Sequence, residues 1–403
     1  MILKGIRVLE WGVFHQAPLA ASLLGSLGAE VIKIEEPGKG DYTRGLGARR
    51  MISGELPGGR KVYFECMNRN KKSIMINLKS DKGREIVHRL VAKSDVFLHN
   101  WRMSAAMKLG MDYETLSKHN PNLIYAVGSA LGLRGPDKDR PGLDYMGQAR
   151  SGIMWIAGEP GMPPLAQMGL GDEVGALVLA LGVVAALLAR ERLGIAQQVD
   201  TSLLSALMWL QHEGLSYVLL KGVEPPREAR EDAQEPLYNT YQCRDGKWIM
   251  LAQGFDPDRY WPRLCAAFGR EDLAKDPRFD TMEKRNQNRK EAIRILDGVF
   301  ATKTRDEWLS ILEEIRGLIF EGVRSLTEVA KDPQALANEY IVDCEHPVLG
   351  KIKAWGHPIT FSKTPMRVTS VAPELGEHTE EVLQNVCGYS WDEIAKLRDE
   401  GAF

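Results

Sequence analysis

The sequence lacks the short motifs that usually identify nucleotide-dependent or metal-dependent enzymes. The turn after the first expected strand reads GVFHQAP without a G-x-G-x-x-G, and no G-x-x-x-x-G-K-[ST] occurs in the chain. The chain also has no G-x-S-x-G, no H-E-x-x-H and no closely spaced group of histidines and cysteines. Dinucleotide-dependent enzymes, serine hydrolases and metalloenzymes therefore lose their main support, and we expect neither a metal nor a tightly bound cofactor.

Cysteine is scarce, odd in number and never arranged as C-x-x-C. The five cysteines are scattered through the 403 residues, at Cys66, Cys243, Cys265, Cys344 and Cys387. This usage argues against a disulfide framework and against a structural zinc site, and it is typical of a reducing compartment. We therefore expect a cytoplasmic protein.

The sequence also lacks a strong excess of charge and a long uncharged run. The formal net charge is −2, which gives no bulk attraction to nucleic acid or to an anionic membrane. The uncharged run 174–189 is shorter than the about 18–20 residues needed to cross a bilayer. We therefore expect neither nucleic acid nor a membrane as a partner, and an anionic ligand would have to be held by local cations.

Apolar strands alternate with helices through the first half of the chain. GIRVLEWG and VIKIEEPG read as buried strands on either side of the helix PLAASLLGSLGAE, and DVFLHN and NLIYAVGS continue the alternation. This pattern predicts an α/β fold with an open, mostly parallel sheet and helices on both faces.

The second half changes character after a charged, proline-rich stretch, VEPPREAREDAQEP. We predict a large domain over residues 1–205, a linker over 206–235 and a smaller α+β domain over 236–325. A return linker over 326–372 then leads to C-terminal helices at 373–403, which complete the large domain by packing on it.

The stretch GLGDEVGALVLALGVVAALLARER places Asp172 behind a glycine-rich turn and in front of a long apolar helix. Asp is a common helix N-cap, so a capping role is the simplest interpretation of its position. The alternative is a reactive carboxylate. We expect backbone N–H groups at the helix start to hold one carboxylate oxygen and to keep the pKa of Asp172 low.

Four separate segments, in order, together with the GLGD turn, resemble the class III CoA-transferases. The segments are LKGIRVLEWG, SLGAEVIKIEEPGKGD, NRNKKSIMINLK and LGEHTEEVL, and the resemblance spans nearly the whole chain. The family includes formyl-CoA transferase and carnitine CoA-transferase and is related to the α-methylacyl-CoA racemases. The resemblance implies a Rossmann-like CoA-binding large domain and two interlocked subunits. We expect a homodimer, with a heterodimer with a related chain as the alternative.

The resemblance also implies roles for individual residues. Asp172 would be the catalytic carboxylate, and His15 and Gln16 would face the thioester and acyl group. The implied CoA-binding residues are His15, Gln16, Asn70, Lys71, Lys72, Asn100, Trp101, Ala105 and Lys108. The chain departs from the family in two places. Glu36 replaces a basic residue that many relatives carry, and the charged stretch 224–236 replaces the Gly-rich loop of formyl-CoA transferase.

The function that the resemblance implies is transfer of CoA from an acyl-CoA to a free carboxylic acid. Asp172 would form a mixed anhydride and then an enzyme–CoA thioester. Amides near Gly147 or Gly254 would stabilise the oxyanions, and Asp144 is a candidate substrate contact or a loop residue bound to its local backbone. The sequence does not name the donor or the acceptor acid.

Two other functions remain open. A racemase needs a second acid/base group, but the segment that matches its G-H-D motif is Gly142, Leu143 and Asp144, and leucine cannot carry a proton. The chain could also be an acyl-CoA-binding subunit of a heteromeric transferase, although such a subunit would not need Asp172.

Overall fold

The computed structural model describes residues 1–45 and 54–403. The described chain divides into two compact units. The first unit contains residues 1–155, 165–221 and 336–403, and the second contains residues 156–164 and 222–335.

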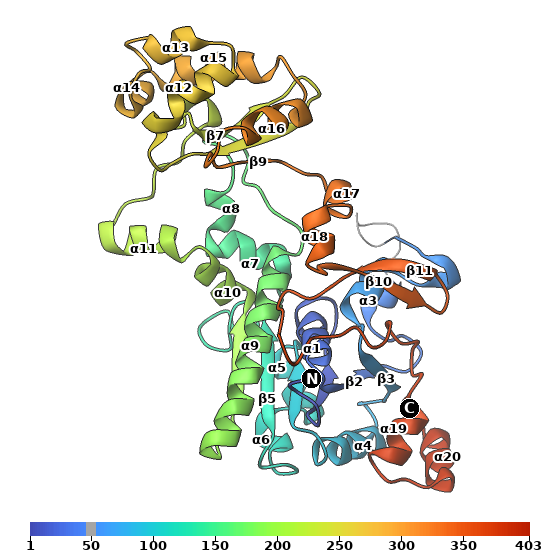
Figure 1. The fold of residues 1–403 in the computed structure, drawn as a ribbon. Coiled ribbons are helices and arrows are strands. Elements are labelled where there is room, and N and C mark those ends of the chain that lie inside the picture. The colour runs from blue at the N-terminus through green and yellow to red at the C-terminus, as the bar shows by residue number, and fades with distance from the viewer. Residues whose placement is uncertain (46–53) are drawn as a thin grey trace. The chain divides into compact units, whose positions relative to one another are not determined.

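A six-stranded sheet forms the centre of the first unit (Figure 1). Its strands are β1 (Arg7–Trp11), β2 (Glu30–Glu35), β3 (Lys71–Met75), β4 (Val96–His99), β5 (Ile124–Ser129) and β6 (Gln198–Ser202). All neighbouring pairs are parallel, in the order β3-β2-β1-β4-β5-β6. The predicted α/β class with a mostly parallel sheet is confirmed. In this strand order the connections reverse between β1 and β4, and ligands bind at the carboxyl ends of the strands on either side.

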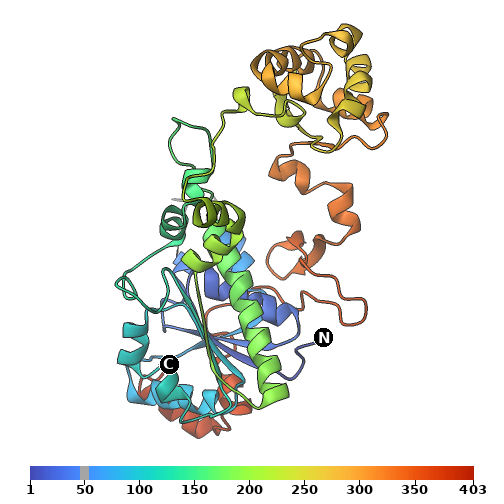
Figure 2. The same cartoon turned by 90° about the vertical axis from the view of Figure 1, so that its left-hand side faces the viewer.

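Successive residues of each strand point to opposite faces of the sheet and contribute to two separate cores. Val8 belongs to the core on one face, beneath α1 (Gln16–Ser26) and α9 (Leu170–Leu193), and Figure 2 shows α9 running along the sheet. Leu9 belongs to the core on the other face, with α4 (Asp81–Val91).

The C-terminal helices join this second core. They are α19 (Thr379–Asn385) and α20 (Trp391–Asp399), and their residues Val382 and Ile394 are 1% exposed. The other helices wholly within the first unit are α2 (Tyr42–Gly45), α3 (Val62–Met67), α5 (Met103–Leu109), α6 (Tyr113–Leu116), α7 (Asp144–Ser151), α10 (Leu203–Leu210), α11 (His212–Lys221) and the 3-10 helix η1 (Pro57–Gly59).

Helix α9 begins after Gly169 and ends before Gly194, both in the left-handed conformation that glycine tolerates best. Among the described residues it is the one helix that is long and apolar enough, by length and composition, to cross a membrane. Its residues Leu179 and Val183 are fully buried in the core that contains Val8.

An antiparallel hairpin begins the part of the chain that returns to the first unit. It consists of β10 (Ile341–His346) and β11 (Gly350–Trp355). The segment that follows is fixed by Asn70, whose side chain donates to the Arg367 carbonyl at 2.8 Å and accepts from the amides of Thr369 and Ser370 at 2.7 and 3.1 Å.

The second unit has its own core around a three-stranded antiparallel sheet in the order β7-β8-β9. Its strands are β7 (Tyr238–Gln242), β8 (Trp248–Ala252) and β9 (Phe320–Gly322). Its helices are α12 (Pro257–Ala267), α13 (Glu271–Lys275), α14 (Met282–Gln287), α15 (Arg289–Phe300), α16 (Arg305–Glu313), α17 (Leu326–Val329) and the 3-10 helix η2 (Arg230–Asp232). Two short helices, α8 (Ile153–Ile156) and α18 (Pro333–Ala337), cross the boundaries between the units.

Candidate active site

Asp172 is the third residue of α9, and its side chain is 19% exposed. The N-cap residue is Gly169, which has no side chain to cap the helix. Asp172 is therefore not an N-cap, which removes the simplest structural explanation for a carboxylate at this position.

The amide groups at the start of α9 donate to a different carboxylate, that of Asp144 at the start of α7. Asp144 Oδ2 accepts from Gly169 N at 3.0 Å, and Oδ1 accepts from Gly171 N at 2.7 Å and from Asp172 N at 3.2 Å. Gln148 Nε2 adds a bond to Oδ2 at 2.7 Å. The expectation that these amides hold an oxygen of Asp172 is therefore wrong, because Asp144 occupies them.

The electrostatic surroundings of Asp172 are also the reverse of those expected. Burial, the charge of Asp144 and the charge of Glu173, in that order, raise the pKa of Asp172 to about 7. Burial and Asp144 also raise the pKa of Glu173. The prediction of a low pKa for Asp172 was wrong because it assumed hydrogen-bond donors that the fold gives to Asp144.

The ring of His15 lies close to Asp172, with His15 Nδ1 3.8 Å from Asp172 Oδ2. The same nitrogen lies 2.9 Å from the hydroxyl of Tyr63. Burial lowers the pKa of His15 to about 4, so its ring is neutral at neutral pH and does not compensate the charge of Asp172.

Gln16, the first residue of α1, is 3% exposed and lies between two glycines of neighbouring elements. A Cβ at Gly128 of β5 would lie 2.3 Å from Gln16 Oε1, and a Cβ at Gly175 of α9 would lie 2.6 Å from Gln16 Nε2. The two glycines thus make the space for this amide, and its Nε2 has no hydrogen-bond partner within the described residues.

The loop between β1 and α1, residues 12–15, is held by the side chains of Lys33, Asn100 and Asp41. Lys33 Nζ donates to the Gly12 carbonyl at 2.8 Å. Asn100 accepts from Val13 N at 2.9 Å and donates to the Val13 carbonyl at 2.8 Å.

Phe14, in the same loop, has a φ of 62°, which is rare for a residue with a side chain. Its amide donates to Asp41 Oδ1 at 3.2 Å. The surroundings therefore maintain a strained loop that leads directly into His15 and Gln16.

An apolar cavity of about 440 Å³ lies beside the start of α9. Its polar lining includes His15, Tyr63 and Glu173. The rest of the lining is Leu19, Leu23, Val62, Cys66, Met67, Met168, Ala176, Leu177, Trp355 and Pro358. Its walls suit an apolar chain, and Glu173 and Met168 belong to the segment that carries Asp172.

A second cavity, of about 280 Å³, lies at the carboxyl ends of β1, β2, β3 and β4. Trp101 and Ala105 line it as the resemblance implies, and the Trp101 ring stacks on Trp11 with centroids 5.4 Å apart. Lys79 also lines this cavity and pairs with Glu36 at 2.9 Å, so a cation accompanies the acidic residue at position 36. Sequence reasoning missed Lys79, which is the last residue of the NRNKKSIMINLK segment.

Several other residues assigned to CoA have partners within the chain. Lys71 is 3% exposed and donates to the Pro18 carbonyl at 2.7 Å and to Asn68 Oδ1 at 2.9 Å, and it pairs with Glu10 at 2.7 Å. Lys72 pairs with Glu30 and Glu381, and Asn70 holds the return segment. Asn100 holds the loop at Val13, and Lys108 is exposed on α5 without lining the cavity. CoA contacts by these residues stay a prediction.

The two glycines assigned to oxyanion binding lie in different units. Gly147 is buried in α7, where an added Cβ would lie 2.6 Å from the Leu203 Cβ. Gly254 lies in the second unit after β8. Their role also stays a prediction.

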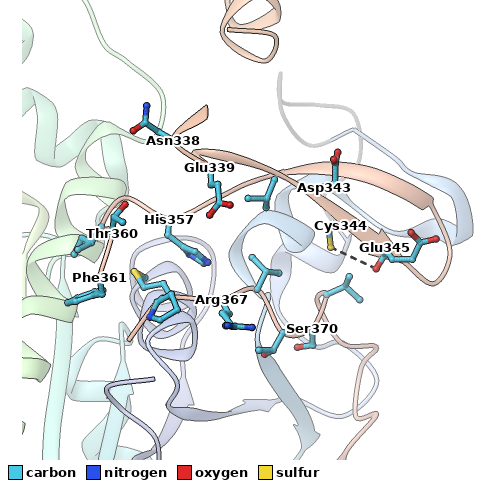
Figure 3. Close-up of a pocket in the computed structure, with 17 residues that line it drawn as sticks. Asn338, Glu339, Asp343, Cys344, Glu345, His357, Thr360, Phe361, Arg367 and Ser370 are labelled. Atoms are coloured by element: carbon cyan, nitrogen blue, oxygen red, sulfur yellow. Dashed lines mark hydrogen bonds between the residues drawn. The ribbon is translucent and has the colours of Figure 1, made fainter. Parts of the chain in front are cut away.

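A third cavity, of about 650 Å³, lies along the return segment of the first unit (Figure 3). Its labelled lining includes Glu339, His357 and Arg367. None of the residues assigned to CoA or to catalysis lines it.

Comparison with known proteins points to one family. The model of CoA-transferase family III matches residues 3–379. The chain is 33% identical to (R)-2-hydroxy-4-methylpentanoate CoA-transferase of Clostridioides difficile, over 99% of this chain and 98% of that protein. It is 32% identical to succinyl-CoA:glutarate CoA-transferase of Mus musculus, over 99% of this chain and 89% of that protein. A solved CAIB/BAIF family protein from Brucella suis has a TM-score of 0.86 and 30% identity, over 95% of this chain and 99% of that chain.

Proposed function

The chain belongs to CoA-transferase family III, and from this premise we propose that it moves CoA from an acyl-CoA thioester to a free carboxylic acid through Asp172. The observation that carries the proposal is a carboxylate at the start of α9 that has no side-chain hydrogen bond within the described residues and has a raised pKa. A carboxylate without donors keeps its electron pairs available for attack on a carbonyl carbon.

The proposed reaction needs only bond exchange at carbonyl carbons. An Asp172 oxygen attacks the thioester carbonyl, the carbon–sulfur bond breaks, and a mixed anhydride and a CoA thiolate form. The thiolate then attacks the Asp172 carbonyl, which releases the donor acid as a carboxylate and leaves an enzyme–CoA thioester. The acceptor carboxylate repeats both steps in reverse order, so no proton is gained or lost over the cycle.

The cavities suggest how the substrate lies. The cavity at the carboxyl ends of β1 to β4 would hold the nucleotide part of CoA, with the Trp101 ring and the Lys79 ammonium on its walls. The apolar cavity beside α9 would hold the acyl chain. The relatives act on a hydroxy acid in one case and on dicarboxylic acids in another, as their names state, so a panel of acids is needed to find the substrate.

The test is a mass-spectrometric screen for exchanged thioesters between a panel of acyl-CoAs and free acids. The active pair is then assayed with Asp172→Ala, for which we expect a loss on the order of 10⁴-fold or more. Hydroxylamine added during turnover should leave a hydroxamate on the peptide that contains Asp172. The matched control is Glu191→Gln, at the exposed far end of the same helix, which should keep parent activity. Transfer near the parent rate by folded Asp172→Ala would overturn the proposal.

The two alternative functions gain no support from the site. Leu143, at the position of the racemase histidine, is 56% exposed and carries no proton. A purely CoA-binding subunit would not need a donor-free carboxylate beside a substrate cavity.

We also propose an interlocked homodimer in the reducing cytoplasm. The chain leaves the first unit at residue 221 and returns to it at residue 336, so two connections flank the main part of the second unit, residues 222–335. If two chains link in this way, monomer should appear on dilution only when unfolding begins. A stable native monomer in sedimentation at nanomolar concentration would contradict this arrangement.

A further inference from the structure

Asp144 has no role in the proposed bond exchange, yet its carboxylate is one of the most completely bonded groups in the described chain. A carboxylate has about four acceptor sites on its two oxygens. Oδ1 accepts from Gly171 N and Asp172 N, and Oδ2 accepts from Gly169 N and Gln148 Nε2. Three of these four donors lie in the turn and first residues of α9, at least 25 positions further along the chain.

The fit between Asp144 and the start of α9 leaves little space for movement. A Cβ at Gly171 would lie 2.9 Å from Asp144 Oδ1, so only glycine permits this approach. Gln148 ties the carboxylate to the segment before α9, because its Oε1 accepts from Gln167 N at 3.0 Å. The contact therefore fixes where α9 begins.

We propose that Asp144 is a positioning residue for CoA transfer: it occupies the amide donors at the start of α9, leaves the Asp172 carboxylate free of them, and places a second negative charge behind it. The inference rests on the proposed function of Asp172. Without Asp144, the amides of Gly171 and Asp172 would be open to the Asp172 carboxylate itself, and such bonds would stabilise its charge and weaken its attack.

The charges around Asp172 agree with this arrangement. Burial and the charges of Asp144 and Glu173 raise the pKa of Asp172 to about 7. From the β1–α1 loop, the neutral ring of His15 faces it at 3.8 Å, and Tyr63 of α3 bonds to that ring. No lysine or arginine within the described residues acts on the pKa of Asp172.

The test compares the pH dependence of kcat/KM, which reports the pKa values of the free enzyme, for the parent and Asp144→Asn. Parent activity should rise with pH through about 7, as Asp172 loses its proton. Removing the charge of Asp144 should shift this rise to lower pH by about one unit. The plateau of kcat should fall about tenfold, since an Asn amide has a single acceptor oxygen and cannot accept from all four donors that bind the Asp144 carboxylate.

The matched control is Asp137→Asn, which removes a carboxylate that pairs with Arg150 of the same helix α7 but does not bond to α9. Its profile should match the parent. If Asp144→Asn does not fold, Gly171→Ala tests the same contact with every charge retained, because its methyl group would displace the Asp144 carboxylate.

The outcomes separate the two proposals. A parent-like profile and a parent-like kcat for Asp144→Asn, or a parent-like kcat for Gly171→Ala, would overturn the positioning role while Asp172→Ala stays inactive. Transfer by Asp172→Ala would instead overturn the proposed function. A rise of kcat/KM at lower pH than in the parent for Asp144→Asn, or a loss of kcat in Gly171→Ala, would support the positioning role.

Discussion

Two groups of charges in the first unit differ in one respect, which is whether each carboxylate meets a cation. The first group, called here the ion cluster, consists of Glu10, Lys33, Asp41 and Lys71. Lys33 Nζ lies 2.8 Å from Glu10 and 3.0 Å from Asp41, and Lys71 Nζ lies 2.7 Å from Glu10. Its two negative and two positive charges are therefore balanced.

The second group, called here the acid cluster, consists of Asp144, Asp172 and Glu173, and it is not balanced. Within the described residues, none of its carboxylates forms an ion pair with a lysine or an arginine, and the ring 3.8 Å from Asp172 is a neutral histidine. The pKa shifts have opposite signs in the two clusters. Lys33 lowers the pKa of Asp41 against the effect of burial, whereas burial and Asp144 raise the pKa of Asp172.

The difference shows how one fold uses buried charge in two ways. The ion cluster holds the strained loop at residues 12–15, because Lys33 binds the Gly12 carbonyl and Asp41 binds the Phe14 amide. The acid cluster leaves the charge of Asp172, the proposed nucleophile, poorly stabilised. Balanced charge supports structure here, and unbalanced charge lies at the proposed site of chemistry.

The largest effect on stability is expected from breaking the ion cluster. Lys33→Met should lower the free energy of unfolding by about 3–5 kcal/mol, because it leaves Glu10 and Asp41 buried without their shared cation. Urea unfolding at pH 7 and fixed protomer concentration measures the change. Lys79→Met is the control, since its pair with Glu36 is exposed and should contribute about 0–1 kcal/mol. Equal losses of unfolding free energy in Lys33→Met and Lys79→Met would contradict the structural role given to the ion cluster.

The sequence predicted the parts of this picture that depend on local pattern. The alternation of apolar strands and helices gave the parallel sheet, and the GLGD turn before an apolar run located Asp172 at a helix start. One more local signal was available. Glu10 and Lys33 are charged residues flanked on both sides by apolar residues within their strands, and they are register partners in β1 and β2.

The predictions that were wrong concern contacts between segments that are distant in the sequence. The helix N-terminus was correctly located, but its donors bind Asp144, which lies 28 positions before Asp172 and reaches it only through the folded chain. The sign of the pKa shift of Asp172 follows from that contact, so no local rule could give it. In the same way, the buried pair of Lys71 with Glu10 is invisible in the NRNKKS segment, where the lysine reads as a surface cation.

Neutralising Asp172 of the acid cluster should raise the free energy of unfolding, whereas neutralising Lys33 of the ion cluster should lower it. The pKa of Asp172 is raised from an ordinary value of 3.8 to about 7, so the folded state favours the protonated acid. The stability that this group contributes is complete below pH about 4 and is lost as the pH rises through about 7. The side chain in Asp172→Asn does not titrate, so this variant does not lose that stability as the pH rises.

We therefore expect Asp172→Asn to match the parent within about 1 kcal/mol at pH 4 and to exceed its free energy of unfolding by about 2–4 kcal/mol at pH 8. Urea unfolding across this pH range measures the difference, and Asp81→Asn, which removes an exposed carboxylate of α4 that pairs with Arg84, should show no comparable trend. A difference between Asp172→Asn and the parent that stays constant from pH 4 to pH 8 would mean that the Asp172 charge is compensated after all. A rising difference, together with the loss of transfer, would show that the carboxylate that makes the protein an enzyme is one that its fold would be more stable without.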